Sequence, residues 1–410
     1  MILLYIDPGT GSMLFALFMG IFGTLIYFCR VIYYKVKFYI KGGRGEKPGL
    51  EKIPYVIYSD DKRYWNTFEP ICDYFEKKGL QLEYWTASED DPGLDKEYNT
   101  VKCRFIGEGN KGFVRLNQMK AGICLSTTPG LDVYQWKRSK DVNWYVHIFH
   151  GASQAVGYRM FGIDFYDAVL TTGPLAVKYI RLLEEMREIR QKELQICGCT
   201  YMDEMLKRKE AAKKPESREK TVLLAPTWGK SGIFSRFGGR IIDALLETKY
   251  HIIIRPHPQS LISEREMIDG LMKDHPDSER IEWNFDNDNF DVLCRTDILI
   301  SDFSGVVYDY TLVFDKPVIY ADTSFDPAPY DIAWTGEDPY VLSALKGLGV
   351  QLKEEDLAGI GDLIEEVLQN NNYSAGRDAA RSQVWSVRGD SARRISEYMI
   401  GKYREITGAA

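Results

Sequence analysis

From residue 54 onward, short apolar runs rich in β-branched residues alternate with helix-length amphipathic segments. This alternation is typical of α/β domains, in which helices connect and cover the strands of a parallel sheet. Two series of such runs are present, and a polar stretch separates them. The sequence therefore predicts two doubly wound, Rossmann-like domains, each within the ordinary size of ~150 to 200 residues.

The expected elements of each series are bounded by turn and cap residues. The first series predicts strands over 55–58, 80–86, 122–127, 144–149 and 168–172, with a helix over 65–78. The second predicts strands over 221–225, 251–255, 297–301 and 317–320. The polar stretch 207–220 is expected to end one helix and to link the halves. We place the N-terminal domain at 54–206 and the C-terminal domain at 218–402.

An apolar segment precedes both domains. Residues 13 to 29 contain no charged side chain, and after Arg30 the apolar character continues to Tyr34. A helix of ~20 apolar residues can cross a bilayer. The cations Lys35, Lys37, Lys41, Arg44 and Lys47 follow the segment, which places the later residues on the cytoplasmic side.

We therefore expect residues 1–45 to be a membrane anchor with a basic juxtamembrane segment. The protein is then located at the cell inner membrane or plasma membrane, with its catalytic domains in the cytoplasm. A cleaved signal peptide is the alternative, but no basic region begins the chain and no cleavage site precedes the lysines. Gly20 and Gly23 leave a shallow re-entrant or interfacial hairpin open.

The net charge and the cysteines indicate which partners, which redox compartment and which metal sites the chain is expected to have. A net charge of −7 argues against a nucleic-acid partner, because binding to phosphate backbones needs a surplus of Lys and Arg. Seven cysteines without a CxxC pair indicate a reducing compartment. Cys197 and Cys199 suit a structural role better than a metal site, so we expect no metal and no cofactor.

Several small polar clusters follow predicted strands directly, where a doubly wound fold binds its ligands. In the first cluster, a strand ends at His150 and Gly151 follows. With a pKa near ~6.5, an imidazole can take a proton from a hydroxyl at neutral pH. The alternative is a buried histidine of structural importance only, and we prefer that interpretation for His147 inside the strand.

The second cluster contains Arg255 and His257, with prolines at 256 and 258 that fix the backbone. Arg255 or His257 can hold a phosphate or stabilise charge on a leaving group. A stiff exit from the strand is the structural alternative, in which Pro258 and its neighbours bind nothing.

The third cluster contains Asp302, Ser304 and Gly305, between a strand and a helix expected over 306–314. Backbone N–H groups at a helix start, a hydroxyl and a residue without Cβ can cradle a pyrophosphate. A plain N-cap serine has the same local pattern. Residues 286–288 resemble a metal triplet, but we expect them to cap a helix over 290–295.

The fourth cluster contains Pro226, Thr227 and Trp228, which place a hydroxyl and an aromatic face after a strand. On its own this cluster is a weak signal of a ligand site.

Together, the four clusters resemble the motifs of the CDP-glycerol glycerophosphotransferase family, the teichoic-acid primases and polymerases. The resemblance covers residues 144–322. His150 and Gly151 match the start of the family's His-Gly-Thr-Pro, and residues 225–228 match its Ala-Pro-Thr-Trp. Residues 255–258 match its Arg-x-His-Pro, and residues 301–305 match its Ser/Thr-Asp-Tyr-Ser-Ser in part.

The resemblance implies a GT-B-like fold, a CDP-alcohol donor and CMP as leaving group. The acceptor is then a hydroxyl of a lipid-linked, polyprenyl-diphosphate type of molecule at the membrane, and self-association is left open. His150 is implied as general base and His257 as an assistant at the phosphate. The implied donor-binding residues are Gly151, Pro226, Thr227, Trp228, Arg255, Pro258, Asp302, Ser304 and Gly305.

Two other functions fit the same pattern. A GT-B glycosyltransferase or nucleotide-sugar epimerase also binds its nucleotide at a serine-containing turn after a strand, and release of UDP instead of CMP would distinguish it. The second alternative is a membrane-anchored binding protein that has lost catalysis. The presence of both His150 and His257 argues against it.

Overall fold

The computed structural model describes residues 52–152, 155–212, 219–321, 323–370 and 372–408. The predicted membrane anchor at residues 1–45 lies outside these ranges. Within them, no helix combines the length and the apolar character that crossing a membrane requires.

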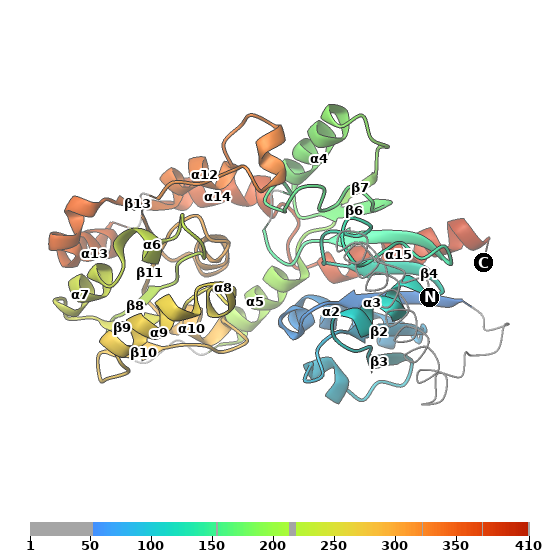
Figure 1. Ribbon diagram of the computed structural model, residues 1–410, viewed down its shortest axis with the longest axis horizontal. Coiled ribbons are helices and arrows are strands. Elements are labelled where there is room, and N and C mark those ends of the chain that lie inside the picture. Colours follow the sequence, from blue (N-terminus) through green and yellow to red (C-terminus); the bar gives the residue numbers. More distant parts are fainter. Residues whose placement is uncertain (1–51, 153–154, 213–218, 322, 371, 409–410) are drawn as a thin grey trace, which may run out of the picture. The chain divides into compact units, whose positions relative to one another are not determined.

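The first sheet has seven parallel strands in the order β3-β2-β1-β4-β5-β6-β7 (Figure 1). The strands are β1 Ile53–Ser59, β2 Leu82–Thr86, β3 Val101–Phe105, β4 Ala121–Ser126, β5 Val142–Ile148, β6 Ala168–Thr171 and β7 Glu193–Ile196. The helical segments along this part of the chain are η1 Lys62–Tyr64, α2 Trp65–Lys78, η2 Pro92–Asp95, α3 Asn110–Asn117, α4 Pro174–Met186 and α5 Thr200–Ala211. The strand order reverses between β1 and β4, and sheets of this kind bind ligands at such a point.

The second sheet has six parallel strands in the order β10-β9-β8-β11-β12-β13. The strands are β8 Thr221–Leu224, β9 His251–Ile254, β10 Ile281–Trp283, β11 Ile298–Ser301, β12 Val318–Ala321 and β13 Gly349–Leu352. The helices are α6 Ile233–Phe237, α7 Arg240–Leu246, α8 Ser260–Ser263, α9 Arg265–Asp274, α10 Phe290–Arg295, α11 Val306–Tyr308, α12 Tyr340–Leu348, α13 Ile360–Gln369, α14 Ser374–Val384 and α15 Ser391–Thr407. A π-helical segment η3 Asp309–Val313 and the 3₁₀ segments η4 Asp331–Trp334 and η5 Glu354–Gly359 complete this half. The order reverses between β8 and β11, as it does between β1 and β4.

The predicted pair of parallel α/β sheets is confirmed. Helix α2 shows how the sequence determines an element, because its apolar residues recur at helical spacing. Trp65, Phe68, Ile71 and Phe75 are buried, and the helix ends where Gly79 takes the left-handed conformation with φ 65°. The edge strands β3, β7, β10 and β13 were not predicted.

The last helix, α15, packs on the first sheet although it follows the second sheet in the chain. The ring of Tyr403 lies 4.9 Å from that of Tyr55 in β1, and Tyr398 accepts a 3.2 Å hydrogen bond from the Trp144 indole in β5. A Cβ at Gly122 in β4 would lie 2.3 Å from the Tyr403 ring. Glycine at 122 therefore allows α15 to approach the sheet.

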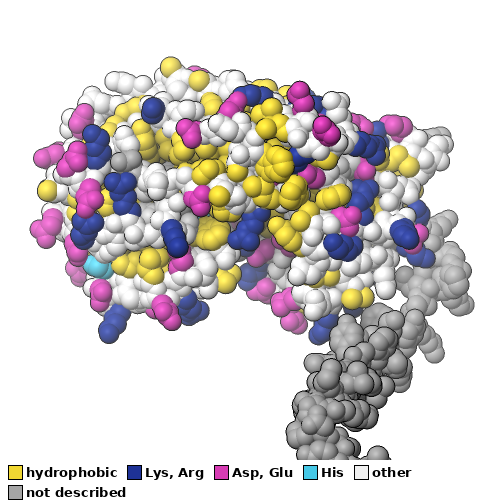
Figure 2. Space-filling view, turned by 45° about the horizontal axis from the view of Figure 1, so that its top comes forward, with side chains coloured by type: hydrophobic (Ala, Val, Ile, Leu, Met, Phe, Trp, Pro, Cys, Tyr) yellow, Lys and Arg dark blue, Asp and Glu magenta, His cyan; other side chains and the backbone are white. Residues whose placement is uncertain are grey.

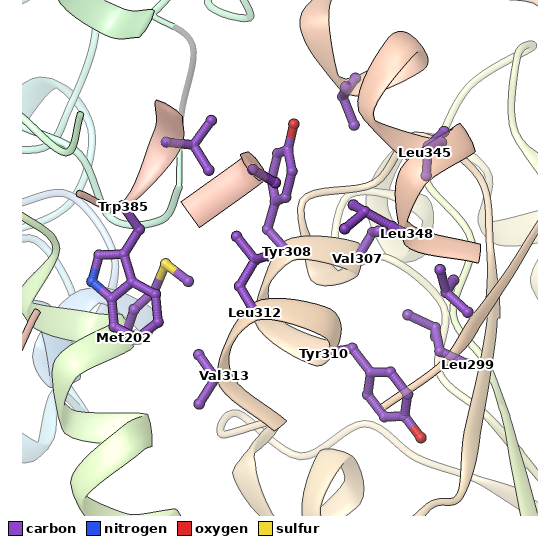
Figure 3. Close-up of a cluster of buried hydrophobic side chains, with 14 of the residues drawn as sticks. Met202, Leu299, Val307, Tyr308, Tyr310, Leu312, Val313, Leu345, Leu348 and Trp385 are labelled. Carbon is purple, nitrogen blue, oxygen red and sulfur yellow. The ribbon is translucent and has the colours of Figure 1, made fainter. Parts of the chain in front are cut away.

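One apolar cluster joins elements from both parts of the chain (Figure 3). Met202 of α5 and Trp385, which follows α14, are fully buried beside Leu312 and Val313 of η3. The Trp385 indole also donates a 3.2 Å hydrogen bond to Asp203. Buried apolar area of this kind stabilises a fold by about 25 cal/mol per Å².

Candidate active site

Asp302 lies at the end of β11 and holds the loop that follows β8. Its carboxylate accepts hydrogen bonds from the backbone N–H groups of Thr227 at 3.0 Å, Ile233 at 3.2 Å and Ser304 at 3.1 Å. Burial raises the pKa of Asp302 to about 6, and these three N–H groups oppose the rise. Asp302 therefore holds the backbone after β8 and β11, the two strands between which the order of the second sheet reverses.

Ser304 and Gly305 occupy the turn between β11 and α11. Ser304 is 9% exposed, and its carbonyl accepts the first helical hydrogen bond, from Val307. Within the described residues no group pairs with the Ser304 hydroxyl, and no atom lies within 4 Å of a Cβ built at Gly305. The turn thus leaves a hydroxyl and open space at the end of β11.

Thr227 and Trp228 follow β8, which lies between β9 and β11 in the sheet. Both side chains are half-buried, whereas Pro226 is buried and leads the chain out of the strand. The Trp228 ring lies 6.5 Å from the His257 ring at the end of β9. The sheet order therefore brings together three of the clusters that the sequence identified.

The ring of His257 has a defined proton position. Its Nδ1 accepts a 3.1 Å hydrogen bond from the backbone N–H of Gln259, so the proton of the neutral ring is on Nε2. Burial and, secondly, the charge of Arg63 lower the pKa of His257 to about 4. At neutral pH, His257 is therefore an uncharged hydrogen-bond donor, and the exposed Pro258 stiffens the chain after it.

The guanidinium of Arg255, which the sequence suggested for binding a phosphate, already makes hydrogen bonds within the protein. The guanidinium donates to the side chain of Asn284 and, at 2.7 Å, to the carbonyl of Asp286. Burial lowers its pKa, yet an arginine stays charged at any ordinary pH. Arg255 thus secures the loop after β10, and two of its donor nitrogens are already engaged.

His150 lies two residues beyond β5 and is half-buried. Its Nδ1 lies 2.9 Å from the hydroxyl oxygen of Thr127, and its ring lies 4.6 Å from the Tyr64 ring. Burial, and then the charge of Arg63, lower its pKa to about 4. His150 is therefore neutral at pH 7, and Gly151 after it has open space at its Cβ position.

His147, which was interpreted from the sequence as a structural histidine, lies in the interior of the first sheet. It is fully buried in β5, and its Nε2 lies 3.1 Å from the Tyr158 hydroxyl. Burial lowers its pKa to about 3. It remains neutral in the interior of the first sheet.

A polar cluster after β1 was not predicted from the sequence. Arg63 is held by Asp61 through two hydrogen bonds of 2.9 Å, and its guanidinium lies 6.0 Å from the Tyr64 ring. Asp60 accepts a 2.8 Å hydrogen bond from Thr128. These residues also follow a predicted strand directly, so the rule that identified His150 would have found them. Since Arg63 lowers the pKa of both His150 and His257, its charge acts on residues from both sheets.

The loop after His150 is joined to the loop after β12. The side chain of Arg187 is buried, and its guanidinium donates to Asp164 at 2.7 Å and to Asp331. The same guanidinium lies 4.8 Å from the Phe161 ring and 5.1 Å from the Trp334 ring. Phe161 and Trp334 are partly exposed. Figure 2 shows exposed hydrophobic side chains gathered near the middle of one face. The Arg187 contacts therefore hold the loop that follows His150 against the loop that follows β12.

No group of three or more His, Cys, Asp or Glu side chains suited to a metal occurs among the residues described. The carboxylate of Asp288 instead accepts a 2.9 Å hydrogen bond from the Phe290 N–H at the start of α10. The expected capping role of residues 286–288 is thus seen at Asp288.

A separate hollow lies between α2, α5 and the start of α15, lined among others by Tyr74, Lys207 and Arg393. Asp203 in its wall already accepts hydrogen bonds from Trp385 and from Ser391 N. Arg393 is paired with Asp390 and Glu397. The hydrogen bonds and ion pairs of Asp203 and Arg393 are therefore made within the protein, whereas the Cβ positions of Gly151 and Gly305 at the strand ends face open space.

The model of the CDP-Glycerol:Poly(glycerophosphate) glycerophosphotransferase family matches residues 165–397, more than half of the chain. The chain belongs to this family. It is accordingly a CDP-glycerol glycerophosphotransferase-like enzyme. The match includes Arg255, His257 and Ser304, but it begins after His150. A comparison with curated protein sequences finds no significant match.

Solved structures share the fold of this family member at low identity. The wall teichoic acid polymerase TagF is 16% identical with a TM-score of 0.56, over 87% of this chain and 91% of that chain. The S. aureus MnaA-UDP structure is 13% identical with a TM-score of 0.58, over 88% and 98%. A Methanocaldococcus jannaschii UDP-GlcNAc 2-epimerase with UDP-GlcNAc and UDP is 13% identical with a TM-score of 0.57, over 86% and 100%. These similarities support the GT-B-like arrangement of two parallel sheets.

Proposed function

We propose that the enzyme transfers glycerol phosphate, or a related polyol phosphate, from a CDP-alcohol to a hydroxyl of a lipid-linked precursor of a cell-envelope polymer. TagF, which shares the fold, is a wall teichoic acid polymerase, and one of its structures is described with CDPG. The observation that carries the proposal is the pair of neutral histidines at strand ends of the two sheets. The positive charge of Arg63 contributes to lowering the pKa of both His150 and His257.

In the proposed reaction, the acceptor hydroxyl oxygen attacks the β-phosphorus of the donor. The new P–O bond forms as the bond from that phosphorus to the bridging oxygen breaks, and CMP leaves with that oxygen. His150 takes the hydroxyl proton on Nε2. The Nε2–H of His257 donates to the phosphate oxygens on which charge develops.

The donor is proposed to lie along the ends of β8, β9 and β11. The Ser304 hydroxyl and the space at Gly305 suit the diphosphate, and the half-buried Trp228 offers a flat face. Asp302 acts indirectly, because its carboxylate holds the backbone of Thr227 and Ser304. Arg63 supplies positive charge from the first sheet, where it can meet a donor phosphate.

A turnover assay tests the chemistry. Membranes that contain the enzyme are incubated with acceptor and with CDP-glycerol, CDP-ribitol or UDP-GlcNAc, and release of CMP or UDP is followed. CMP release from a CDP-alcohol supports the proposal. Release of UDP alone would favour a glycosyltransferase or an epimerase, and a UDP-GlcNAc 2-epimerase shares the fold.

The role of His150 is tested by His150→Gln. General-base catalysis contributes about 10²- to 10⁴-fold, so turnover should fall by that factor while donor affinity is kept. His251→Gln, at the start of β9 and near Glu279 and Glu282, is the matched control. If His150→Gln kept more than about a tenth of wild-type turnover at saturating substrates, the general-base assignment would be wrong.

Membrane association is proposed from the apolar run at residues 13–29 and the cations after it. The full chain is expected in the membrane fraction, and a variant without residues 1–51 in the soluble fraction. The shortened variant should still bind CDP-glycerol but use a lipid-linked acceptor poorly. Recovery of the full chain in the soluble fraction without detergent would contradict this proposal.

A further inference from the structure

Thr127 is placed to control the proposed base. Its side chain follows β4, the strand that lies beside β5, and it is 1% exposed. Its hydroxyl oxygen lies 2.9 Å from His150 Nδ1. Because the hydroxyl is buried, this contact is shielded from exchange with solvent.

Tyr158 packs against the residues just before His150. The Tyr158 hydroxyl lies 3.1 Å from His147 Nε2. The Tyr158 ring stacks on Phe149 with a centroid distance of 5.8 Å and an interplanar angle of 12°. Ring contacts with Tyr64 and Tyr158 therefore surround the strand end that carries His147 and His150.

A base at His150 needs an unprotonated nitrogen that faces the acceptor hydroxyl. In a neutral imidazole one nitrogen carries the proton and the other carries a lone pair. If Nδ1–H donates to the Thr127 oxygen, Nε2 carries the lone pair. The same bond also fixes the plane of the ring, as does the Tyr64 ring at 4.6 Å.

We propose that Thr127 is a positioning residue, which accepts a hydrogen bond from His150 Nδ1 and so keeps Nε2 unprotonated for the acceptor hydroxyl. This inference rests on the proposed function for its catalytic consequence. A carboxylate in this position would raise the basicity of the ring, whereas a hydroxyl orients the ring without adding charge. The negative phosphates of a bound donor then provide the charge that favours the protonated ring.

Thr172 shows that a buried threonine in this fold does not require such a partner. It follows β6, is fully buried, and its hydroxyl has no hydrogen-bond partner within the described residues. A Thr→Val change keeps the shape of the side chain and removes only the hydroxyl function. Thr172→Val is therefore a matched control for Thr127→Val.

The experiment compares the full chain with Thr127→Val, Thr127→Ser and Thr172→Val. The protein is labelled with ¹⁵N at its five histidines, and the ring nitrogen signals of His150 are assigned with His150→Gln. Nitrogen chemical shifts then report which ring nitrogen carries the proton. CMP release at saturating CDP-glycerol and acceptor is measured on the same proteins, together with KM for the donor.

In the wild type and in Thr127→Ser, the proton of His150 is expected on Nδ1. In Thr127→Val it should move to Nε2, and kcat should fall about 10- to 100-fold with little change in donor KM, as for other partners that orient a functional imidazole. Thr172→Val should match the wild type in both measurements.

Two results would overturn the inference. One is an unchanged proton position in Thr127→Val, and the other is a changed position with unchanged kcat. Failure of the proposed function has a different signature, because the wild type would then release no CMP from any CDP-alcohol. In that case the proton position in Thr127→Val still decides whether Thr127 orients His150.

Discussion

Both carboxylate oxygens of Asp302 lie 3.0 Å from the backbone nitrogen of Thr227. The same carboxylate accepts from Ile233 and Ser304, so one buried side chain joins the loops after β8 and β11. The sequence grouped Asp302 with the residues that touch the donor. Its contacts instead indicate that it acts on the proposed donor site through the backbone around it.

The first prediction concerns Asp302→Asn. The amide nitrogen of asparagine would face backbone N–H donors, so some of them would lose their acceptor. The free energy of unfolding should fall by about 1 to 3 kcal/mol, and the affinity for CDP-glycerol should weaken as well. Urea denaturation and calorimetric titration measure the two effects. The exposed Asp269→Asn is the control, and equal stability losses in both variants would contradict the role of Asp302.

The second prediction separates Ser304 from Arg255. Ser304→Ala removes a hydroxyl that has no partner within the described residues, so stability should change little while donor affinity falls. Arg255→Ala also leaves Asn284 and the Asp286 carbonyl without a donor, so stability should fall together with affinity. A lost charge-assisted hydrogen bond to the donor is worth about 1.5 to 3 kcal/mol. Unchanged donor affinity in both variants would show that these residues only shape the strand ends.

The third prediction concerns Arg63→Gln. The charge of Arg63 lowers the pKa of His150 and His257, so its removal should raise both. The acidic limb of the kcat/KM profile reports groups of the free enzyme, and in the wild type it is expected near pH 4. In Arg63→Gln this limb should move to higher pH. Arg104→Gln, on the edge strand β3, is the control, and an unmoved limb would refute the influence of Arg63.

The pH expected for the acidic limb of the kcat/KM profile differs from the pH that the sequence alone predicts. An isolated imidazole has a pKa near ~6.5, which places the limb near neutrality. In the folded protein, burial and Arg63 lower the pKa of His150 to about 4. Burial depends on residues from several strands, so the sequence at His150 alone does not reveal it.

Central strands could be predicted from the sequence, whereas edge strands could not. A strand buried on both sides is a continuous apolar run, as in β9 with Ile252, Ile253 and Ile254. In the edge strands β3 and β7, exposed residues alternate with half-buried ones, and β10 has only three residues. Such short mixed patterns resemble loops.

Candidate site residues could be proposed where polar residues follow a strand whose apolar run is evident, as for His150 and Ser304. The partners that complete the candidate site were missed, because Thr127 was interpreted as the last residue of a strand. Its contact with His150 depends on the neighbouring position of β4 and β5. The packing of α15 on the first sheet likewise depends on contacts such as Tyr403 with Gly122, which sequence periodicity does not encode.

The last prediction concerns the pH dependence of stability. Asp309 in η3 is 8% exposed, lies 3.5 Å from the Tyr201 hydroxyl, and has a pKa that burial raises to about 7. Its ordinary value is 3.8, so the folded state holds the proton more tightly than the unfolded state does. The stability from this proton is fully present below pH 3.8 and is lost as the pH rises through about 7.

Asp309→Asn replaces the carboxyl by a neutral amide, which should remove this dependence. One pKa unit corresponds to about 1.4 kcal/mol, so the variant should be more stable than the wild type at pH 8 by a few kcal/mol. At pH 5 the two proteins should differ much less. His150 and His257 have lowered pKa values and lose stability as the pH falls from 6.5 towards 4, but they do so equally in both proteins. Thermal unfolding at the two pH values measures the difference, and an equal difference at both would show that Asp309 does not titrate in this range.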